Sequence, residues 1–215
     1  MRTLLWCVSV SLLLGACDER IAPLRPTPES VEPFVCDERA APPESESLQW
    51  KRLSALTSDL EGALELGSNE LCNELNLIPC AEVHRTALGS NDAFGAARYE
   101  PVASPLATTP SAVDRLVLSA CENAVARDAS GPPRVFTDLP PDDAALDITD
   151  ASTANAIEGQ IAALYRRLLM RDAEAVEIDL VRELALDASG APRTARELDV
   201  LACFAIGTTS EMVLF

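Results

Sequence analysis

The sequence has few of the residues that metal sites and acid–base catalysis most often use. His84 is the only histidine and Lys51 the only lysine among its 215 residues. A single histidine excludes a metal site with several histidines and a pair of catalytic histidines. The chain also lacks a C-x-x-C pair, a P-loop and a G-x-G-x-x-G loop. These absences argue against a thioredoxin-like centre, a c-type haem attachment and the common nucleotide-binding motifs.

Basic side chains are also scarce. The chain carries 17 Lys and Arg against 34 Asp and Glu, which gives a formal net charge of −17. A general nucleic-acid binder needs a basic face that replaces phosphate counterions, so the sequence predicts no nucleic-acid partner. Hydrophobic residues nevertheless make up 48% of the chain. That share is too large for a wholly disordered acidic protein, and the length suits one folded domain with an additional segment.

The N-terminus has the pattern of an export signal. Arg2 precedes an apolar run of eleven residues, Leu4 to Leu14, which is typical of a signal peptide and too short to cross a bilayer as a permanent helix. The run ends in LGAC (Leu14–Cys17), which resembles the lipobox of bacterial lipoproteins. The resemblance implies that residues 1–16 are removed and that Cys17 carries the lipid that anchors the protein to a membrane. The alternative is an ordinary secretory signal that happens to end at a cysteine.

The segment that follows Cys17 is rich in proline. Residues 18–46 contain six of the fifteen prolines and show no helical apolar period. Such a segment cannot bury enough surface to fold, and repeated proline keeps it extended. We therefore expect residues 17–46 to form a disordered tether between the membrane and a domain at residues 47–215.

The apolar pattern of that domain predicts an all-α fold of about five helices. Apolar residues recur every three or four positions in five segments, which start near residues 53, 109, 152, 173 and 195. Gly67 is expected to close the first helix, and Thr109, Asp172 and Thr194 to cap the second, fourth and fifth. Asp150 is expected at the start of the third helix, where its negative charge suits the helix dipole. Alternation with a period of two is sustained nowhere in the domain.

A long stretch without a pattern, about residues 84–108, separates the first two main helices. Loops of this length are uncommon in compact domains and are often functional. We therefore predict a candidate binding loop that contains Asn91, Asp92, Phe94 and Tyr99, with both aromatic rings packed back on the helices. A packed loop without a function is the alternative.

The cysteines of the domain suggest one local disulfide and one long-range pair. Cys72 and Cys80 flank a short connection, so we expect them to be bonded in an exported protein. Cys121 and Cys203 both fall on apolar helix faces. They could bridge two packed helices or remain two buried thiols. Cys36 is left over on the tether, and we assign it no redox role.

No constellation of residues indicates a catalytic site, a metal or a cofactor. A zinc site built on Cys80 and His84 needs two further ligands, and zinc-finger spacing supplies none. The acidic residues between Asp138 and Asp150 lack the spacing of a calcium loop. Carboxylates in the long loop, such as Asp92 and Glu100, could in principle support glycoside hydrolysis.

Two segments near the C-terminus resemble known sequences. They are Tyr165–Asp172 (YRRLLMRD) and Leu201–Ser210 (LACFAIGTTS), and both are similar to segments of helical domains in secreted and surface proteins of bacteria. The match departs from that pattern at Met170, where the motif has glycine, and at Ala173, where it has proline. The resemblance implies a helical envelope domain and carries over no catalytic residue.

Together these patterns predict a lipid-anchored protein of the cell envelope with a non-enzymatic binding or scaffolding role. Its expected partners are the membrane, through the lipid on Cys17, and another envelope protein. Two other functions stay open at this point. One is an accessory component of an envelope electron-transfer or substrate-handling system, and the other is a carboxylate-based hydrolase.

Overall fold

A computed structural model describes residues 49–75, 77–95, 97, 99–100 and 105–214 of the chain. The chain divides into two units, Met1–Ser45 and Glu46–Phe215, and the described residues all belong to the second. The expected signal segment, the lipid site at Cys17, the tether and Cys36 therefore lie outside the described residues. Among the residues described, no helix has both the length and the apolar character needed to cross a membrane.

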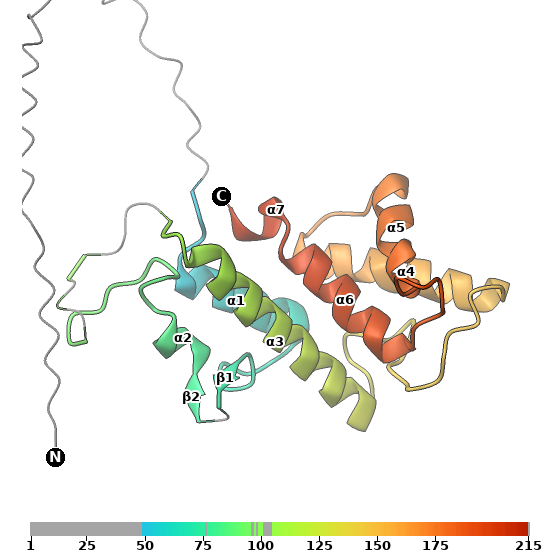
Figure 1. Ribbon diagram of the computed structural model, residues 1–215, viewed down its shortest axis with the longest axis horizontal. Helices are drawn as coiled ribbons and strands as arrows, with labels where there is room; N and C mark the ends of the chain where they lie inside the picture. The colour runs from blue at the N-terminus through green and yellow to red at the C-terminus, as the bar shows by residue number, and fades with distance from the viewer. Residues whose placement is uncertain (1–48, 76, 96, 98, 101–104, 215) are drawn as a thin grey trace, which may run out of the picture. The chain divides into compact units, whose positions relative to one another are not determined.

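The second unit is built almost entirely of helices (Figure 1), which confirms the predicted all-α class. The five long helices fall on the five predicted segments. A small hairpin of two strands and three short helical turns are additional to the prediction. In chain order the elements are α1 (Leu53–Leu64), β1 (Asn73–Glu74), β2 (Ile78–Pro79), α2 (Cys80–Val83), α3 (Thr109–Ser130), α4 (Ala151–Leu168), α5 (Ala175–Arg182), the 3-10 turn η1 (Glu183–Ala185), α6 (Ala195–Gly207) and α7 (Ser210–Val213).

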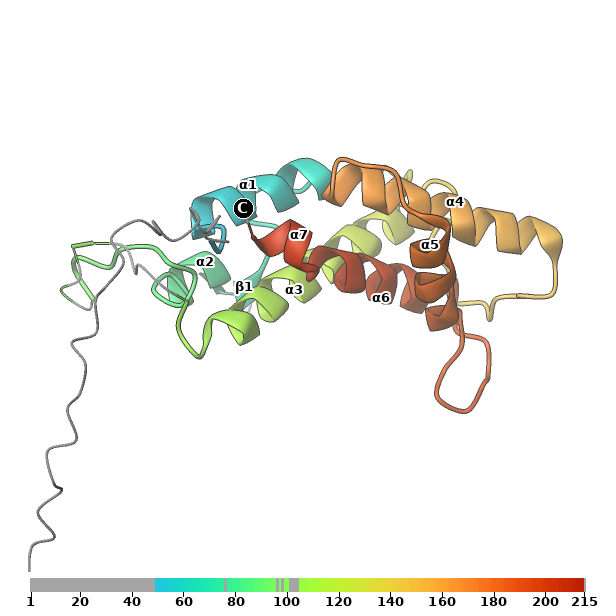
Figure 2. The same ribbon diagram turned by 90° about the horizontal axis from the view of Figure 1, so that it is seen from above.

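The centre of the core is the contact between α3 and α6, which lie side by side in Figures 1 and 2. The helices approach so closely that a Cβ atom on Gly207 would lie 2.7 Å from Cγ1 of Val117. A disulfide between Cys121 and Cys203 joins them, with 5.8 Å between the two Cα atoms. Closing a loop of 82 residues in this way stabilises the fold by about 4.5 kcal/mol in the chain-entropy model.

The end of α1 is held by arginines from two other helices. Arg127 on α3 donates Nη1–H to the carbonyl oxygens of Leu64 (2.9 Å) and Glu65 (2.7 Å), and Arg167 on α4 donates to that of Ala63 (3.3 Å). These carbonyls have no partner within their own helix, and positive charge is favourable at this end of the helix dipole. The same contacts tie α1 to both α3 and α4.

Three of the predicted helix caps are wrong. Glu65, in a left-handed conformation with φ 52°, closes α1 in place of Gly67, because the arginines bind the chain two residues earlier. Thr109 is the first residue of α3 rather than its cap, and its hydroxyl donates to the carbonyl oxygen of Ala87 at 2.6 Å. Glu174 caps α5 in place of Asp172.

The cap of α5 moves to Glu174 because Arg171 forms an ion pair with Glu177. Arg171 donates to both carboxylate oxygens of Glu177 (2.8 and 2.6 Å), which fixes the side chain of Glu177 at the start of the helix. Glu177 in turn accepts the backbone N–H of Glu174 at 2.8 Å, so the capping box forms around Glu174. The cap predicted for α6 is confirmed, since Thr194 forms a capping box with Glu197. Asp150 lies at the start of α4 as predicted, and it also caps this helix by accepting the Thr153 N–H.

Two aspartates are buried in the core, and their surroundings differ sharply. Asp128 on α3 accepts the backbone N–H groups of Arg134, Val135 and Phe136 at 2.8–3.0 Å and the guanidinium of Arg127. Burial alone would raise the pKa of Asp128, but these hydrogen bonds outweigh it and lower the pKa below its usual value. Asp128 therefore holds the loop after α3 as a charged group.

Asp199 on α6 has no such partners. Its side chain is 0% exposed, and neither carboxylate oxygen has a hydrogen-bond partner among the described residues. Burial, together with the negative charge of Asp128, raises the pKa of Asp199 to about 9. Asp199 is thus a neutral carboxylic acid at neutral pH.

We predict that Asp199 makes the fold less stable as the pH rises, and that Asp199→Asn removes this effect. The unfolded state loses the Asp199 proton near pH 3.9, whereas the folded state keeps it up to about pH 9. Between these values the free energy of unfolding should fall by up to about 1.4 kcal/mol per pH unit in the native chain relative to the variant. Urea unfolding at several pH values between 5 and 8 measures the difference. Parallel stability curves for the two proteins would contradict the prediction.

Candidate functional site

The most distinctive surface feature of the domain is a small hairpin, residues 72–80, which we call the cystine hairpin. Strand β1 pairs antiparallel with β2, so that Asn73 faces Pro79 and Glu74 faces Ile78. Cys72 and Cys80 form a disulfide with 5.3 Å between their Cα atoms, and the Cys80 N–H donates to the carbonyl oxygen of Cys72 at 3.0 Å. Strands this short are not stable alone. The disulfide that the sequence suggested therefore closes the hairpin covalently.

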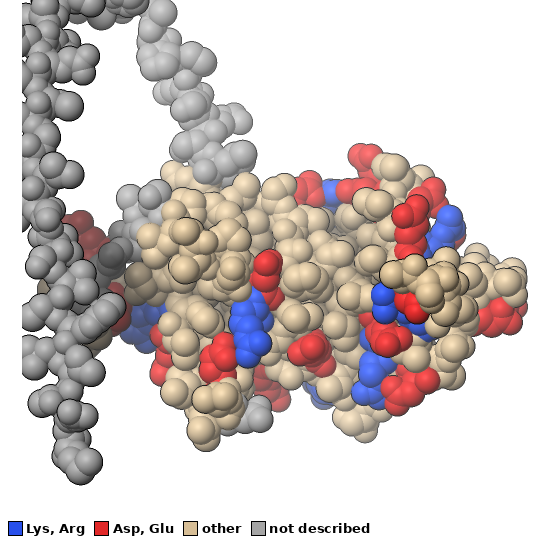
Figure 3. Space-filling view, viewed as in Figure 1, with Lys and Arg blue, Asp and Glu red and all other residues tan. Residues whose placement is uncertain are grey.

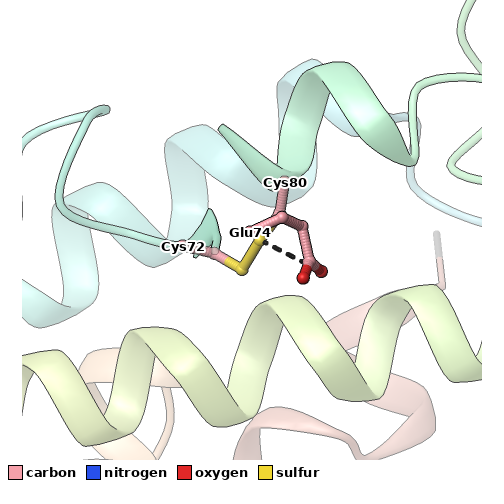
Figure 4. Close-up of side chains that lie close together, drawn as sticks. All are labelled: Cys72, Glu74 and Cys80. Atoms are coloured by element: carbon pink, nitrogen blue, oxygen red, sulfur yellow. Dashed lines mark hydrogen bonds between the residues drawn. A yellow bond between two sulfur atoms is a disulfide. The ribbon is translucent and has the colours of Figure 1, made fainter. Parts of the chain in front are cut away.

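The carboxylate of Glu74 lies beside the Cys72–Cys80 disulfide (Figure 4). Arg115 on α3 binds it with both arms, Nε to Oε1 at 3.0 Å and Nη2 to Oε2 at 2.9 Å. Nε2 of His84 lies 3.1 Å from the same Oε1, and Sγ of Cys80 lies 3.8 Å from it. Hydrogen bonds from Arg115 and then from His84 lower the pKa of Glu74.

The cystine hairpin is attached to α3 at two points. One is the Arg115–Glu74 pair, which joins residues 41 positions apart. The other is Asn123, whose Nδ2–H donates to the carbonyl oxygen of Glu70 at 2.7 Å, just before the hairpin. A groove of about 490 Å³ lies between these attachments, and polar and charged side chains make up most of its lining. The hairpin is thus held to the helix by polar contacts, and its apolar side chains are left to solvent.

Those apolar side chains form an exposed tip. Leu75 and Leu77 are 86% and 81% exposed, and Ile78 and Val83 are about half exposed. Figure 3 shows tan surface at the lower left, where Figure 1 places β2, with acidic and basic side chains around it. Each fully exposed leucine forgoes roughly 1.5–3 kcal/mol of burial free energy. Clustered apolar exposure of this kind often marks a surface for binding another molecule.

The predicted binding loop after α2 differs from expectation. Phe94 is 102% exposed and Tyr99 75% exposed, so the prediction that both rings pack back on the helices is wrong. Asn91 is exposed, and the carboxylate of Asp92 accepts the Gly95 N–H at 2.8 Å. Small and polar residues surround the rings along this stretch of sequence, which gives them no apolar surface to cover. Asp92 closes a local turn in the structure.

Sequence reasoning missed Glu74 and Arg115, and it paired His84 with Cys80 without finding a further partner. The signal for His84 was present: it follows Cys80 by four positions, and its N–H donates to the Cys80 carbonyl oxygen at 2.8 Å across the turn of α2. Glu74 stands two residues after Cys72, but nothing in the local pattern separates it from other surface acids. Arg115 reaches the hairpin only because α3 packs beside it.

We predict that the carboxyl group of Glu74 titrates below its usual range, and that Arg115→Gln returns the midpoint toward the ordinary value of 4.5. The reason is that the guanidinium of Arg115 favours the charged form of Glu74. Carbonyl NMR of the Glu74 side chain as a function of pH measures the midpoint in both proteins. Asp179→Asn, which removes an exposed partner of Arg182 on α5, is a control that should leave it unchanged. Equal midpoints in the native chain and Arg115→Gln would refute this role of Arg115.

Comparison with known proteins gives this site no relative from which a role could be transferred. No family model matches the chain, and no curated protein and no solved structure is significantly similar to it. The resemblances to the lipobox and to helical envelope domains are therefore still expectations from sequence. What the site does has to follow from its own geometry: a covalently closed hairpin, fixed to α3, with an exposed apolar tip.

Proposed function

We propose that this chain is a lipid-anchored protein of the cell envelope whose helical domain binds a protein partner through the tip of the cystine hairpin. The observation that carries the proposal is the exposure of Leu75 and Leu77 on a closed hairpin. The envelope location and the anchor rest on the lipobox resemblance at Leu14–Cys17, outside the described residues.

Preorganisation favours a binding role for the hairpin. Its conformation is constrained by the disulfide, by the bidentate Arg115–Glu74 pair and by the bond from the Leu77 N–H to the Glu74 carbonyl oxygen (3.0 Å). A segment that is already ordered loses little conformational entropy on binding, so more of the contact energy appears as affinity. Constrained leucines at a tip are well suited to fill a pocket on another protein.

The chemistry of the partner surface follows from the tip and from the charge of the chain. Leu75 and Leu77 require an apolar pocket. The net charge of −17 and the exposed Glu70 and Glu82 beside the hairpin favour basic residues around that pocket. Charge complementarity of this kind mainly raises the rate of association and selects the partner. We therefore expect an envelope protein with an apolar pocket and a basic rim.

The two other functions suggested by sequence gain no support of their own from the described residues. Asp92, one of the carboxylates considered for hydrolysis, holds the Gly95 N–H in a turn. No observation on the described part of the chain favours an accessory role in electron transfer. A binding role uses the geometry that is present and requires no further group.

The anchor makes a direct prediction. Cells that express the full chain and are fed labelled palmitate should incorporate label into the native protein, and Cys17→Ala should abolish it, because Cys17 is the proposed acylation site. Cys36→Ala, which removes the other cysteine before the domain, should keep the label. Label retained in Cys17→Ala would overturn the anchor and leave the hairpin proposal standing.

The hairpin makes a second prediction. A photo-crosslinking residue at position 78, next to Leu77, should form an adduct of defined mass with one envelope protein in intact cells. The change Leu75→Ser/Leu77→Ser should remove that adduct, because it removes the apolar contact. The matched control is Val176→Ser/Leu180→Ser, since these α5 residues are exposed to a similar degree, 68% and 66%.

The outcome depends on comparing the hairpin variant with the α5 control variant. The control variant should keep the adduct at position 78, and both variants should show the helical circular dichroism of the native chain. An adduct that the control variant loses as Leu75→Ser/Leu77→Ser does, or one that survives the change at Leu75 and Leu77, would contradict a docking role for the hairpin.

A further inference from the structure

We propose that the cystine hairpin is also a zinc site: when the Cys72–Cys80 disulfide is reduced, Cys72, Glu74, Cys80 and His84 bind one Zn²⁺. This inference does not depend on the proposed partner. It rests on four side chains of the types that zinc prefers, drawn from a stretch of thirteen residues and gathered around one carboxylate oxygen.

The distances bring three of the four ligands together and place the fourth, His84, beside Glu74. One ligand atom from each of Cys72, Glu74 and Cys80 lies within 4.8 Å of the other two. Glu74 Oε1 lies 3.1 Å from His84 Nε2 and 3.8 Å from Cys80 Sγ. With zinc–sulfur bonds near 2.3 Å and zinc–nitrogen or zinc–oxygen bonds near 2.0–2.1 Å, the edges of such a tetrahedron are roughly 3.4–3.8 Å. Reduction frees the two bonded sulfur atoms to separate to such an edge length. His84, which contacts the group through Glu74, has to turn toward the sulfur atoms.

Burial also matches a structural zinc site. Cys72 and Cys80 are 3% and 0% exposed, and the side chains of Glu74 and His84 are 22% and 27% exposed. Structural zinc sites are closed in this way, with four protein ligands and no open position for substrate.

Arg115 completes the electrostatics of the site. Two thiolates and one carboxylate carry three negative charges, and Zn²⁺ and the guanidinium together carry three positive charges. Arg115 binds Glu74 through Nη2 to Oε2 at 2.9 Å and through Nε to Oε1 at 3.0 Å. The metal would bind a second lone pair of Oε1, while Arg115 keeps the carboxylate oriented. Partners of this kind hold metal ligands in place and tune their affinity. Arg115 is thus a positioning residue in this proposal.

The conversion between the two forms balances with a dithiol as the reductant. The dithiol gives two electrons and two protons to the Cys72–Cys80 bond and becomes a disulfide itself, while Cys72 and Cys80 become thiols. Zn²⁺ then replaces the two thiol protons, which pass to water, and binds the carboxylate of Glu74 and the neutral imidazole of His84. Either the disulfide or the metal closes the same loop.

The second disulfide provides an internal comparison. Cys121 and Cys203 are also buried. Among the described residues, however, only Cys72, Glu74 and Cys80 form a group of three Cys, His, Asp or Glu side chains with ligand atoms within 4.8 Å of one another. Reduction of Cys121–Cys203 should therefore create two thiols without a zinc site.

The test is zinc binding by the full chain after reduction and anaerobic removal of the reductant. Competition with a coloured chelator should give one Zn²⁺ per chain, and none for the oxidised protein. Glu74→Gln and His84→Ala, which remove ligands, should weaken binding most, and Arg115→Gln, which removes the partner of a ligand, should weaken it by roughly tenfold. Cys72→Ser/Cys80→Ser should abolish binding, and Cys121→Ser/Cys203→Ser should retain it.

A thermal melt keeps the test decisive if reduction loosens the fold. Zinc should raise the melting temperature, or restore the helical signal, of the reduced native chain, and it should do neither for the double variant Glu74→Gln/His84→Ala. If zinc binds equally well without Glu74 and His84, the two thiols alone account for the binding, and the proposed four-ligand site does not exist. No binding by the reduced chain, or binding that Cys72→Ser/Cys80→Ser retains, would also overturn the proposal.

Discussion

The close contact between α3 and α6 is the constraint on which the rest of this domain depends. Gly207 lets the two helices meet at Val117, and the Cys121–Cys203 disulfide keeps them together. Because α3 is fixed by α6, its other side chains can hold separate parts of the chain. Arg127 binds the end of α1, Asp128 binds the loop after α3, and Arg115 and Asn123 bind the region of the cystine hairpin.

The two buried carboxyl groups, Asp128 and Asp199, differ in protonation state because their surroundings differ. Asp128 is surrounded by donors and stays ionised, whereas Asp199 has none and holds its proton. At the surface, Glu74 is ionised because Arg115 and His84 bind it. That one carboxylate attaches the hairpin to α3, and its neighbours are the side chains that could bind zinc. The attachment through polar groups leaves Leu75 and Leu77 exposed, which is the basis of the proposed binding role.

The sequence predicted the helices well because their signals are local. Apolar periodicity located the five main helices, and the Thr194–Glu197 capping box needed only residues three positions apart. The cap at Asp172 was wrong because Arg171 fixes Glu177, and only the folded chain brings that about. The cystine hairpin could be predicted only in part. Cys72 and Cys80 were visible as a pair, but Arg115 lies 41 residues from Glu74, and the exposure of Leu75 and Leu77 depends on which side of the hairpin faces α3.

The central claim is that the cystine hairpin is a rigid platform that presents apolar side chains to solvent. Backbone ¹⁵N relaxation of the oxidised domain tests it most directly, because it reports motion residue by residue. The account predicts order parameters for β1 and β2 close to those of α3, near the value of about 0.85 typical of rigid backbone. Values below about 0.6 across the hairpin, in a protein whose α3 is rigid, would contradict it.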